Sequence, residues 1–470
     1  MKFLIFIMYV LVCPLAFSAL SLQEFYYLPL AWSKFEWRLE PVILIIILSY
    51  LLSKVPLDKG FPFIKITIYI FYYVFFCIIP CYLYKIGYNP NYISVTFEVS
   101  EYMFGFDLVI ISLVAYEFGS SCVGRQKVPR SYLRAFETKG MSPYVIYFCV
   151  AISTGSIVAF SIIVGNPFLL VADRSEFADY FDLDSSPASF AMISMLTRVP
   201  ALMALAILAT LLVTKSKISS APIFPAIMLI TLPFSILANF PTAVPRFWLG
   251  SIIFCLALIY MIERDGIIRK LYSAAVLFSL LVAFPFAGIL RNYFSDDRVH
   301  SFRTLVLDGY SNGQYDIFMM LLAVVRYVNV FGYTNGNQIL GSVLFWVPRS
   351  IYGGKPYGTG YMVAQALQFD FYNLASPLLS EMYIDFGIVG VAISFVLFGF
   401  VITKQERLVS LGKATEIRKI VLAFVGGWMV ILQRGSMNVA IANLVPLLIL
   451  AWFVSVYFYG QKWRSERKYV

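Results

Sequence analysis

The chain has 470 residues, of which 60% are hydrophobic and only 13% are charged. Soluble globular domains contain about 45–50% apolar and about 25% charged residues, so this composition excludes them, together with disordered and disulfide-scaffold proteins. The formal net charge is +10. In so apolar a chain, the placement of the positive residues sets orientation in a membrane, and we expect no binding to nucleic acid.

Apolar runs recur through most of the sequence, and a helix of about 17–25 such residues crosses a bilayer. They predict an all-α polytopic integral membrane protein with about twelve transmembrane helices. The predicted spans are residues 3–20, 41–53, 66–84, 102–119, 144–164, 199–214, 222–239, 247–262, 271–289, 386–402, 420–433 and 439–459.

The first run follows Lys2 and contains Ala16-Phe17-Ser18. This pattern fits an uncleaved first span, and a cleavable signal peptide stays open as the alternative. With the amino terminus inside, most lysines and arginines of the short loops fall on the cytoplasmic side, which predicts that both termini are cytoplasmic.

The spans divide the chain into three parts. Residues 1–289 form a nine-span membrane domain, residues 290–385 form one large external loop between the ninth and tenth spans, and residues 386–470 form a three-span membrane domain with a cytoplasmic tail. Two apolar runs in the loop, Ile317–Val325 and Ile339–Val347, are too short to cross a bilayer. They predict short helices that lie in the interface or re-enter the membrane from outside.

Five cations from distant parts of the sequence fall at the external face in this topology: Arg246, Arg291, Arg349, Lys355 and Arg434. A guanidinium group suits phosphate because its planar fork forms two parallel charge-assisted hydrogen bonds. The alternative is that these side chains extend to anionic lipid headgroups. A cation in a short turn against apolar helices is costly unless it is paired, which favours a binding role for Arg246, Arg291 and Arg434.

Carboxylates provide the candidate for proton transfer. Ser376-Pro377 predicts the start of a helix, with Ser376 as its N-cap. Glu381 and Asp385 then share one face of this helix at its external mouth. Either they complement the helix dipole, or Glu381 is a base that deprotonates an acceptor hydroxyl. The acidic run 173–184 lacks calcium-loop spacing and predicts a solvated loop, with contacts to a sugar or a divalent ion as the alternative.

The sequence gives little support for a metal site or a nucleotide-binding loop. His300 is the only histidine, and the six cysteines lie in or beside apolar runs, so we expect no metal and no cofactor. The Gly-rich stretch from Gly353 to Gly360 lacks the spacing of a nucleotide loop. We expect it to be a flexible crossover that brings backbone amides and Lys355 close to a ligand.

The sequence Val347-Pro-Arg-Ser-Ile-Tyr-Gly-Gly-Lys-Pro356, followed by Ser376-Pro-Leu-Leu-Ser-Glu-Met-Tyr-Ile-Asp-Phe-Gly-Ile-Val-Gly390, resembles the large periplasmic loop of bacterial O-antigen polymerases of the Wzy type. The span pattern is similar to that family over nearly the whole chain. Arg298 with Gly309 and Arg349 with Gly360 also fit the Arg-x10-Gly spacing discussed for such loops.

This resemblance implies a multi-pass protein of the bacterial inner membrane that works at its periplasmic face. The growing glycan would move from undecaprenyl diphosphate to the non-reducing end of a new undecaprenyl-diphosphate-linked repeat unit. The implied partners are this lipid-linked oligosaccharide, membrane lipids, and the chain-length regulator, flippase and ligase of the same pathway.

In this hypothesis Glu381, Arg291 and Arg349 are catalytic. The side chains that bind the diphosphate are Arg246, Tyr352, Lys355 and Arg434. Two alternatives stay open: an O-antigen ligase, which shares the large loop and the diphosphate chemistry, and a lipid-linked oligosaccharide flippase or other transporter.

Overall fold

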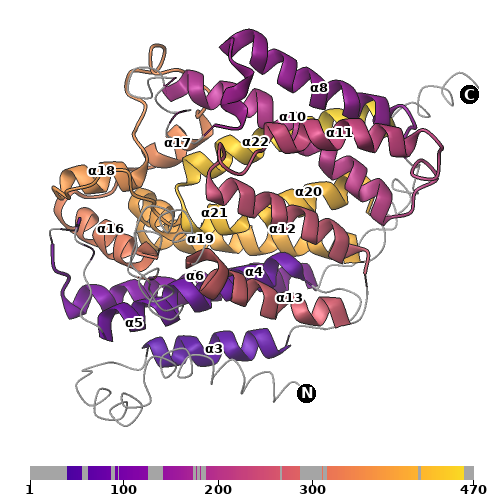
Figure 1. Cartoon of the computed structure of the whole chain (residues 1–470). Helices are drawn as coiled ribbons and strands as arrows, with labels where there is room; N and C mark the ends of the chain where they lie inside the picture. The colour runs from indigo at the N-terminus through magenta and orange to yellow at the C-terminus, as the bar shows by residue number, and fades with distance from the viewer. Residues whose placement is uncertain are drawn as a thin grey trace, which may run out of the picture.

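The structure is a computed structural model of the chain, and its regular secondary structure is helical in the residues it describes (Figure 1). These are residues 40–54, 62–85, 90, 92–93, 95–124, 141–172, 176, 180, 187–264, 267–285, 310, 315–410 and 414–459.

Six helices in this part of the chain are long and apolar enough to cross a bilayer. They are α4–η1–α5 (Phe63–Tyr73, Val74–Ile78, Ile79–Lys85), α6 (Val99–Gly124), α8 (Val145–Val164), α10 (Pro187–Val213), α19 (Leu378–Ser410) and α22 (Met437–Tyr459). Each overlaps a predicted span, although α10 begins earlier than predicted and α19 extends beyond its span at both ends. The helices and their apolar composition indicate a membrane-embedded protein, as the sequence predicted.

Five other predicted spans fall on shorter helices. These helices are α3 (Glu40–Lys54), α11 (Phe224–Ala238), α12 (Arg246–Ile262), α13 with η3 (Ile267–Phe278, Ser279–Ala283), and the pair α20 (Glu416–Gly427) and α21 (Met429–Arg434). The first predicted span, residues 3–20, lies outside the described residues. A count of twelve spans and the sides on which the termini and loops lie therefore stay predictions.

The two helices α6 and α19 cross in direct backbone contact. A Cβ atom on Gly119 would lie 1.9 Å from the carbonyl oxygen of Val396, and one on Gly399 would lie 2.1 Å from that of Tyr116. Small residues let helices approach closely inside a membrane, where dispersion contacts rather than the hydrophobic effect hold them together. The long helix α19 is thereby fixed along α6.

A residue with a positive φ angle interrupts the helical backbone of α19. Gly387 has φ +63° and ψ −153°, and a Cβ atom there would lie 2.9 Å from the hydroxyl of Tyr333. Side chains with a Cβ atom rarely adopt such φ values, so glycine suits this position. The bend separates a first segment that carries Glu381 and Asp385 from the long apolar remainder of the helix.

The chain between residues 315 and 377 forms three short helices: α16 (Ile317–Phe331), α17 (Asn337–Val343) and α18 (Thr359–Ala366). They gather at the end of the bundle where α19 begins, at the left of Figure 1. Residues Ile317–Val325 are buried throughout, so protein covers the apolar part of α16 and it is not a helix lying on a surface. Its partners include η1, α6, α18 and α19.

Candidate functional site

Glu381 lies in the first turn of α19 and is only 2% exposed. The hydroxyl of Thr359 donates a hydrogen bond of 2.6 Å to Oε2, and the N–H of Met437 lies 3.4 Å from Oε1. Met437 begins α22, so this N–H is one of the donors that a helix leaves without a partner at its N-terminus. The carboxylate therefore joins the starts of α18, α19 and α22.

Backbone contacts bring the same three segments together. A Cβ atom on Gly435 would lie 1.5 Å from the carbonyl oxygen of Ser376, and one on Gly360 would lie 2.1 Å from that of Leu374. Gly435 also has φ +92°, which favours glycine. These approaches explain why glycines flank the polar residues of this region: any side chain would push the segments apart.

Three buried polar groups in this region lack a hydrogen-bond partner: Ser376 Oγ, Ser380 Oγ and Gln433 Nε2. The sequence predicted Ser376 as the N-cap of α19, and this is wrong, because its hydroxyl accepts no N–H of the helix. A buried polar group without a partner costs about 1–3 kcal/mol. Together with Thr359 and Glu381, these residues form what we call the outer cluster, after the side of the membrane on which the sequence predicts it.

Asp385 has a different task from Glu381. Its carboxylate accepts the N–H groups of Gln338 and Ile339 at 3.2 and 2.8 Å, and the hydroxyl of Thr334. The two N–H groups belong to the first turn of α17, so Asp385 caps that helix and complements its dipole. The prediction that acidic residues here serve a helix N-terminus thus fits Asp385, but the helix is α17 and not α19.

Arg434 ends α21, directly before Gly435. Its half-buried guanidinium lies 4.5 Å from the ring centroid of Phe247, and Asp316 lies within electrostatic reach. Burial raises the pKa of Asp316 to about 6, while the hydrogen bond from Tyr92 and the charge of Arg434 act in the opposite direction. The predicted ligand Arg434 therefore lies on an aromatic face, within the electrostatic influence of a carboxylate and next to the outer cluster.

Two other predicted arginines are described in part or not at all. Arg246 is the first residue of α12, and its neighbour Phe247 is the ring beneath Arg434. The side chain of Arg246 lies outside the described part of the structure, as does the whole of Arg291. The backbone therefore brings Arg246 into the neighbourhood of Arg434, and the position of Arg291 stays a prediction.

Arg349 and Lys355 hold the loop in which they occur. Arg349 donates to the carbonyl oxygens of Lys355 and Pro356 and stacks 4.0 Å from the ring centroid of Tyr357. Lys355 Nζ donates to the carbonyl oxygens of residues 345 and 347 at 2.7 and 3.0 Å. Desolvation and the charge of Arg349 lower the pKa of Lys355.

Tyr352 lies within this same turn, where its N–H donates to the carbonyl of Pro348 at 3.0 Å. Arg349, Tyr352 and Lys355 are thus together in one loop. This loop leads through Gly358 into Thr359, but the described contacts of Arg349 are with its own loop, whereas Arg434 stacks on Phe247. A role for either group in binding one shared diphosphate stays a prediction.

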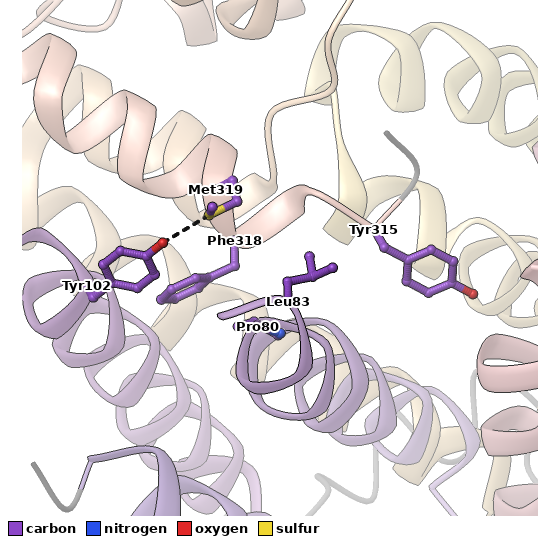
Figure 2. Close-up of a pocket in the computed structure, with 6 residues that line it drawn as sticks. All are labelled: Pro80, Leu83, Tyr102, Tyr315, Phe318 and Met319. Atoms are coloured by element: carbon purple, nitrogen blue, oxygen red, sulfur yellow. Dashed lines mark hydrogen bonds between the residues drawn. The ribbon is translucent and has the colours of Figure 1, made fainter. Parts of the chain in front are cut away.

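A small pocket lies between α5, α6 and the start of α16 (Figure 2). Its lining is apolar and aromatic, and the hydroxyl of Tyr102 donates to Met319 Sδ at 3.6 Å. The lining residues are Pro80, Leu83, Tyr102, Tyr315, Phe318 and Met319. The hydroxyl of Tyr315, one of these lining residues, donates a hydrogen bond to the carbonyl oxygen of Leu280.

A second polar group, which we call the inner cluster, surrounds the other end of α19. Lys65 Nζ pairs with Glu117 at 2.9 Å and donates to Ser120 at 2.9 Å. Thr403 also donates to Ser120 at 2.9 Å. Glu406 accepts the N–H of Ile64 at 2.6 Å, at the start of α4.

Sequence reasoning singled out Glu381 and Arg434 but not Thr359, Ser380, Gln433 or Asp316, which lie in the same region. Gln433 carried a usable signal, since an amide within the apolar run Val430-Ile-Leu-Gln433 is costly in a membrane and often functional. Thr359 and Asp316 had none, because their roles depend on segments distant in the sequence.

Among the described residues, no group of three His, Cys, Asp or Glu side chains is placed to hold a metal ion. Of the carboxylates in the acidic run 173–184, the structure describes Glu176 alone. No protein-family model, curated protein or solved structure matches the chain.

Proposed function

We propose that this protein polymerises lipid-linked oligosaccharide repeat units at the periplasmic face of a bacterial inner membrane. The growing glycan would be transferred from undecaprenyl diphosphate to the terminal sugar of a new undecaprenyl-diphosphate-linked unit. One observation carries the proposal: a buried carboxylate, Glu381, lies where the starts of three helices meet, and the same junction continues directly into Arg434.

In the proposed reaction, a hydroxyl oxygen of the acceptor sugar attacks the anomeric carbon of the donor glycan. The bond between that carbon and the diphosphate oxygen breaks, and the diphosphate leaves with the electron pair. Glu381 takes the proton of the attacking hydroxyl. A positioned base of this kind contributes about 10²–10⁴-fold to the rate.

The leaving diphosphate gains negative charge as the bond breaks. Arg434 would stabilise it, because preorganised cations act most strongly where charge develops and water is scarce. Arg246 begins the helix against which Arg434 stacks and is proposed as its partner. Arg291, Arg349, Tyr352 and Lys355 remain proposed contacts for the same diphosphate. The chemistry needs no cofactor.

The resemblance to O-antigen polymerases supports this reaction over its two competitors. An O-antigen ligase would use the same donor but would pass the glycan to the lipid A core. A flippase would need charged residues lining a central cavity between two similar halves, whereas the buried polar residues described above lie at the two ends of α19. The chain-length regulator, flippase and ligase would then be partners of this protein.

Deleting the gene and separating the lipopolysaccharide on a gel tests the proposal. A polymerase deletion leaves one repeat unit on the core, a ligase deletion leaves none, and an unchanged ladder would refute a role in this pathway.

Complementing the deletion strain with variants of the protein then tests the role of the positive charge of Arg434. We expect Arg434→Ala to reduce polymerisation about a hundredfold or more, with the protein still inserted. Arg264→Ala is the matched control, because Arg264 stacks on Tyr260 at the opposite end of α12, 4.9 Å from the ring centroid. Normal ladders from Arg434→Ala would exclude this arginine from the reaction.

A further inference from the structure

We infer that Ser376, Ser380 and Gln433 form a binding subsite for the hydroxyl groups of the acceptor sugar, beside Glu381. This inference rests on the proposed function and names the residues that would hold one of its two substrates. The observation behind it is independent of the sequence resemblance: three buried polar atoms in the outer cluster have no hydrogen-bond partner.

These atoms are well covered. Ser376 and Ser380 are 0% exposed and Gln433 is 1% exposed. Native proteins pair most of their buried polar atoms, so each exception requires an explanation. Nine such atoms occur among the described residues, and three of them lie in the outer cluster, where bonding capacity is left for a group that the chain itself does not supply.

The three residues belong to the two segments that meet at Glu381. Ser380 directly precedes Glu381 in α19, and the backbone of Ser376 touches Gly435. Gln433 lies two residues before Gly435, while Met437, two residues after it, is the N–H partner of Glu381. The unpartnered groups therefore lie on the segment that carries the carboxylate and on the segment that donates to it.

The chemistry of these groups suits a carbohydrate. A serine hydroxyl can donate and accept, the Gln433 amide nitrogen donates, and the Glu381 carboxylate accepts. A sugar presents neighbouring hydroxyls that each donate and accept, and so can pair with all of these groups. Sites that hydrogen-bond a substrate hydroxyl discriminate strongly against analogues that lack it, because their own polar groups then stay unpaired.

The test uses the full-length protein in lipid vesicles with two substrates. The donor is an undecaprenyl-diphosphate-linked repeat unit whose acceptor hydroxyl is chemically capped, and the acceptor is the uncapped unit at varied concentration. The variants are Ser380→Ala and Gln433→Leu. The matched control is Ser49→Ala, because Ser49 on α3 is also a fully buried serine whose hydroxyl lacks a partner.

We expect each of the two variants to raise the apparent KM for the acceptor about tenfold, with the maximal rate and the KM for the donor little changed. Ser49→Ala should leave all three quantities at the wild-type level. Thermal stability of Ser380→Ala in detergent should equal or exceed that of the wild type, because the change removes an unpaired buried group.

Two results would overturn the inference in different ways. If the wild type polymerises but both variants keep the wild-type KM for the acceptor, the unpaired groups bind only water and the proposed function survives. If the wild type transfers nothing between the two substrates, the proposed function fails and the subsite fails with it.

Discussion

The two ends of α19 use the same device for different results. At each end a carboxylate of α19 accepts N–H groups at the start of another helix: Asp385 for α17 and Glu381 for α22 at the outer end, and Glu406 for α4 at the inner end. Such carboxylates satisfy donors that a helix leaves open and complement its dipole. These hydrogen bonds alone can attach α17, α22 and α4 to α19, without any catalytic role for the carboxylates.

The difference lies in how the remaining polar groups are paired. In the inner cluster Lys65 neutralises Glu117, and the hydroxyls of Ser120 and Thr403 bond to each other. Two buried oxygens there have no partner, Glu406 Oε2 and the hydroxyl of Tyr116, whose ring lies beneath Lys65. In the outer cluster two serine hydroxyls and the Gln433 amide nitrogen lack partners. The comparison teaches that an ion pair and a bond between hydroxyls satisfy most of the inner cluster, whereas three neutral polar groups of the outer cluster are left for a ligand.

The largest expected difference comes from the carboxylates themselves. Glu381→Gln keeps the size and the acceptor oxygen of the side chain but removes the base, so polymerisation should fall about 10²–10⁴-fold. Glu406→Gln makes the same change at the inner end and should alter the rate by only a few fold, since its amide oxygen can still accept the N–H of Ile64. Ladder length in complemented cells and the rate in vesicles measure both. Equal losses from the two variants would remove the distinction between the ends.

A smaller effect, on stability, is expected when the close backbone approach at the outer end of α19 is disturbed. Gly435→Ala places a methyl group 1.5 Å from the Ser376 carbonyl at φ +92°, and overpacking of this kind costs about 1–3 kcal/mol or more. Gly250→Ala, in α12, is the control because nothing lies within 4 Å of its Cβ position. Thermal unfolding in detergent should show a loss for the first variant alone. A wild-type melting temperature for Gly435→Ala would contradict the described junction.

The smallest effect concerns the ion pair of the inner cluster. The side chains of Lys65 and Glu117 are 17% and 31% exposed. A partly exposed pair contributes roughly 1 kcal/mol or less, so a double-mutant cycle of Lys65→Met and Glu117→Gln should give a coupling energy in that range. None of the three variants should shorten the glycan if the inner cluster is structural. Loss of polymerisation from an inserted, stable variant would assign the inner cluster a functional role as well.

Part of the site could be predicted from the sequence, and the reasons differ by residue. Glu381 stood out because a carboxylate at the mouth of an apolar helix is conspicuous, and Arg434 because a guanidinium between two apolar runs is costly. Asp385 has the same local signal as Glu381, yet it caps α17. The two carboxylates are four residues apart on one helix, and only the packing of α17 and α22 against it gives them different partners.

The predicted spans show the same limit. Hydropathy counts apolar residues and does not distinguish a helix covered by lipid from one covered by protein. Residues 317–325 are as apolar as many spans, but α16 is buried against η1, α6, α18 and α19. Residues 420–433 were predicted as one span and are two helices, α20 and α21, that meet at Trp428.

The sequence alone determined the class of this protein: a chain with 60% hydrophobic residues in recurrent long runs must satisfy its backbone polar groups internally, and helices in a membrane do so. It also marked the carboxylates and arginines that are costly there. Only the tertiary structure decided which groups are paired, because Thr359, Ser376, Glu381 and Gln433 come from segments that meet only when α18, α19, α21 and α22 pack together. Whether two groups form a hydrogen bond depends on differences of a few tenths of an ångström in the distance between donor and acceptor. Packing, rather than local sequence, sets that distance.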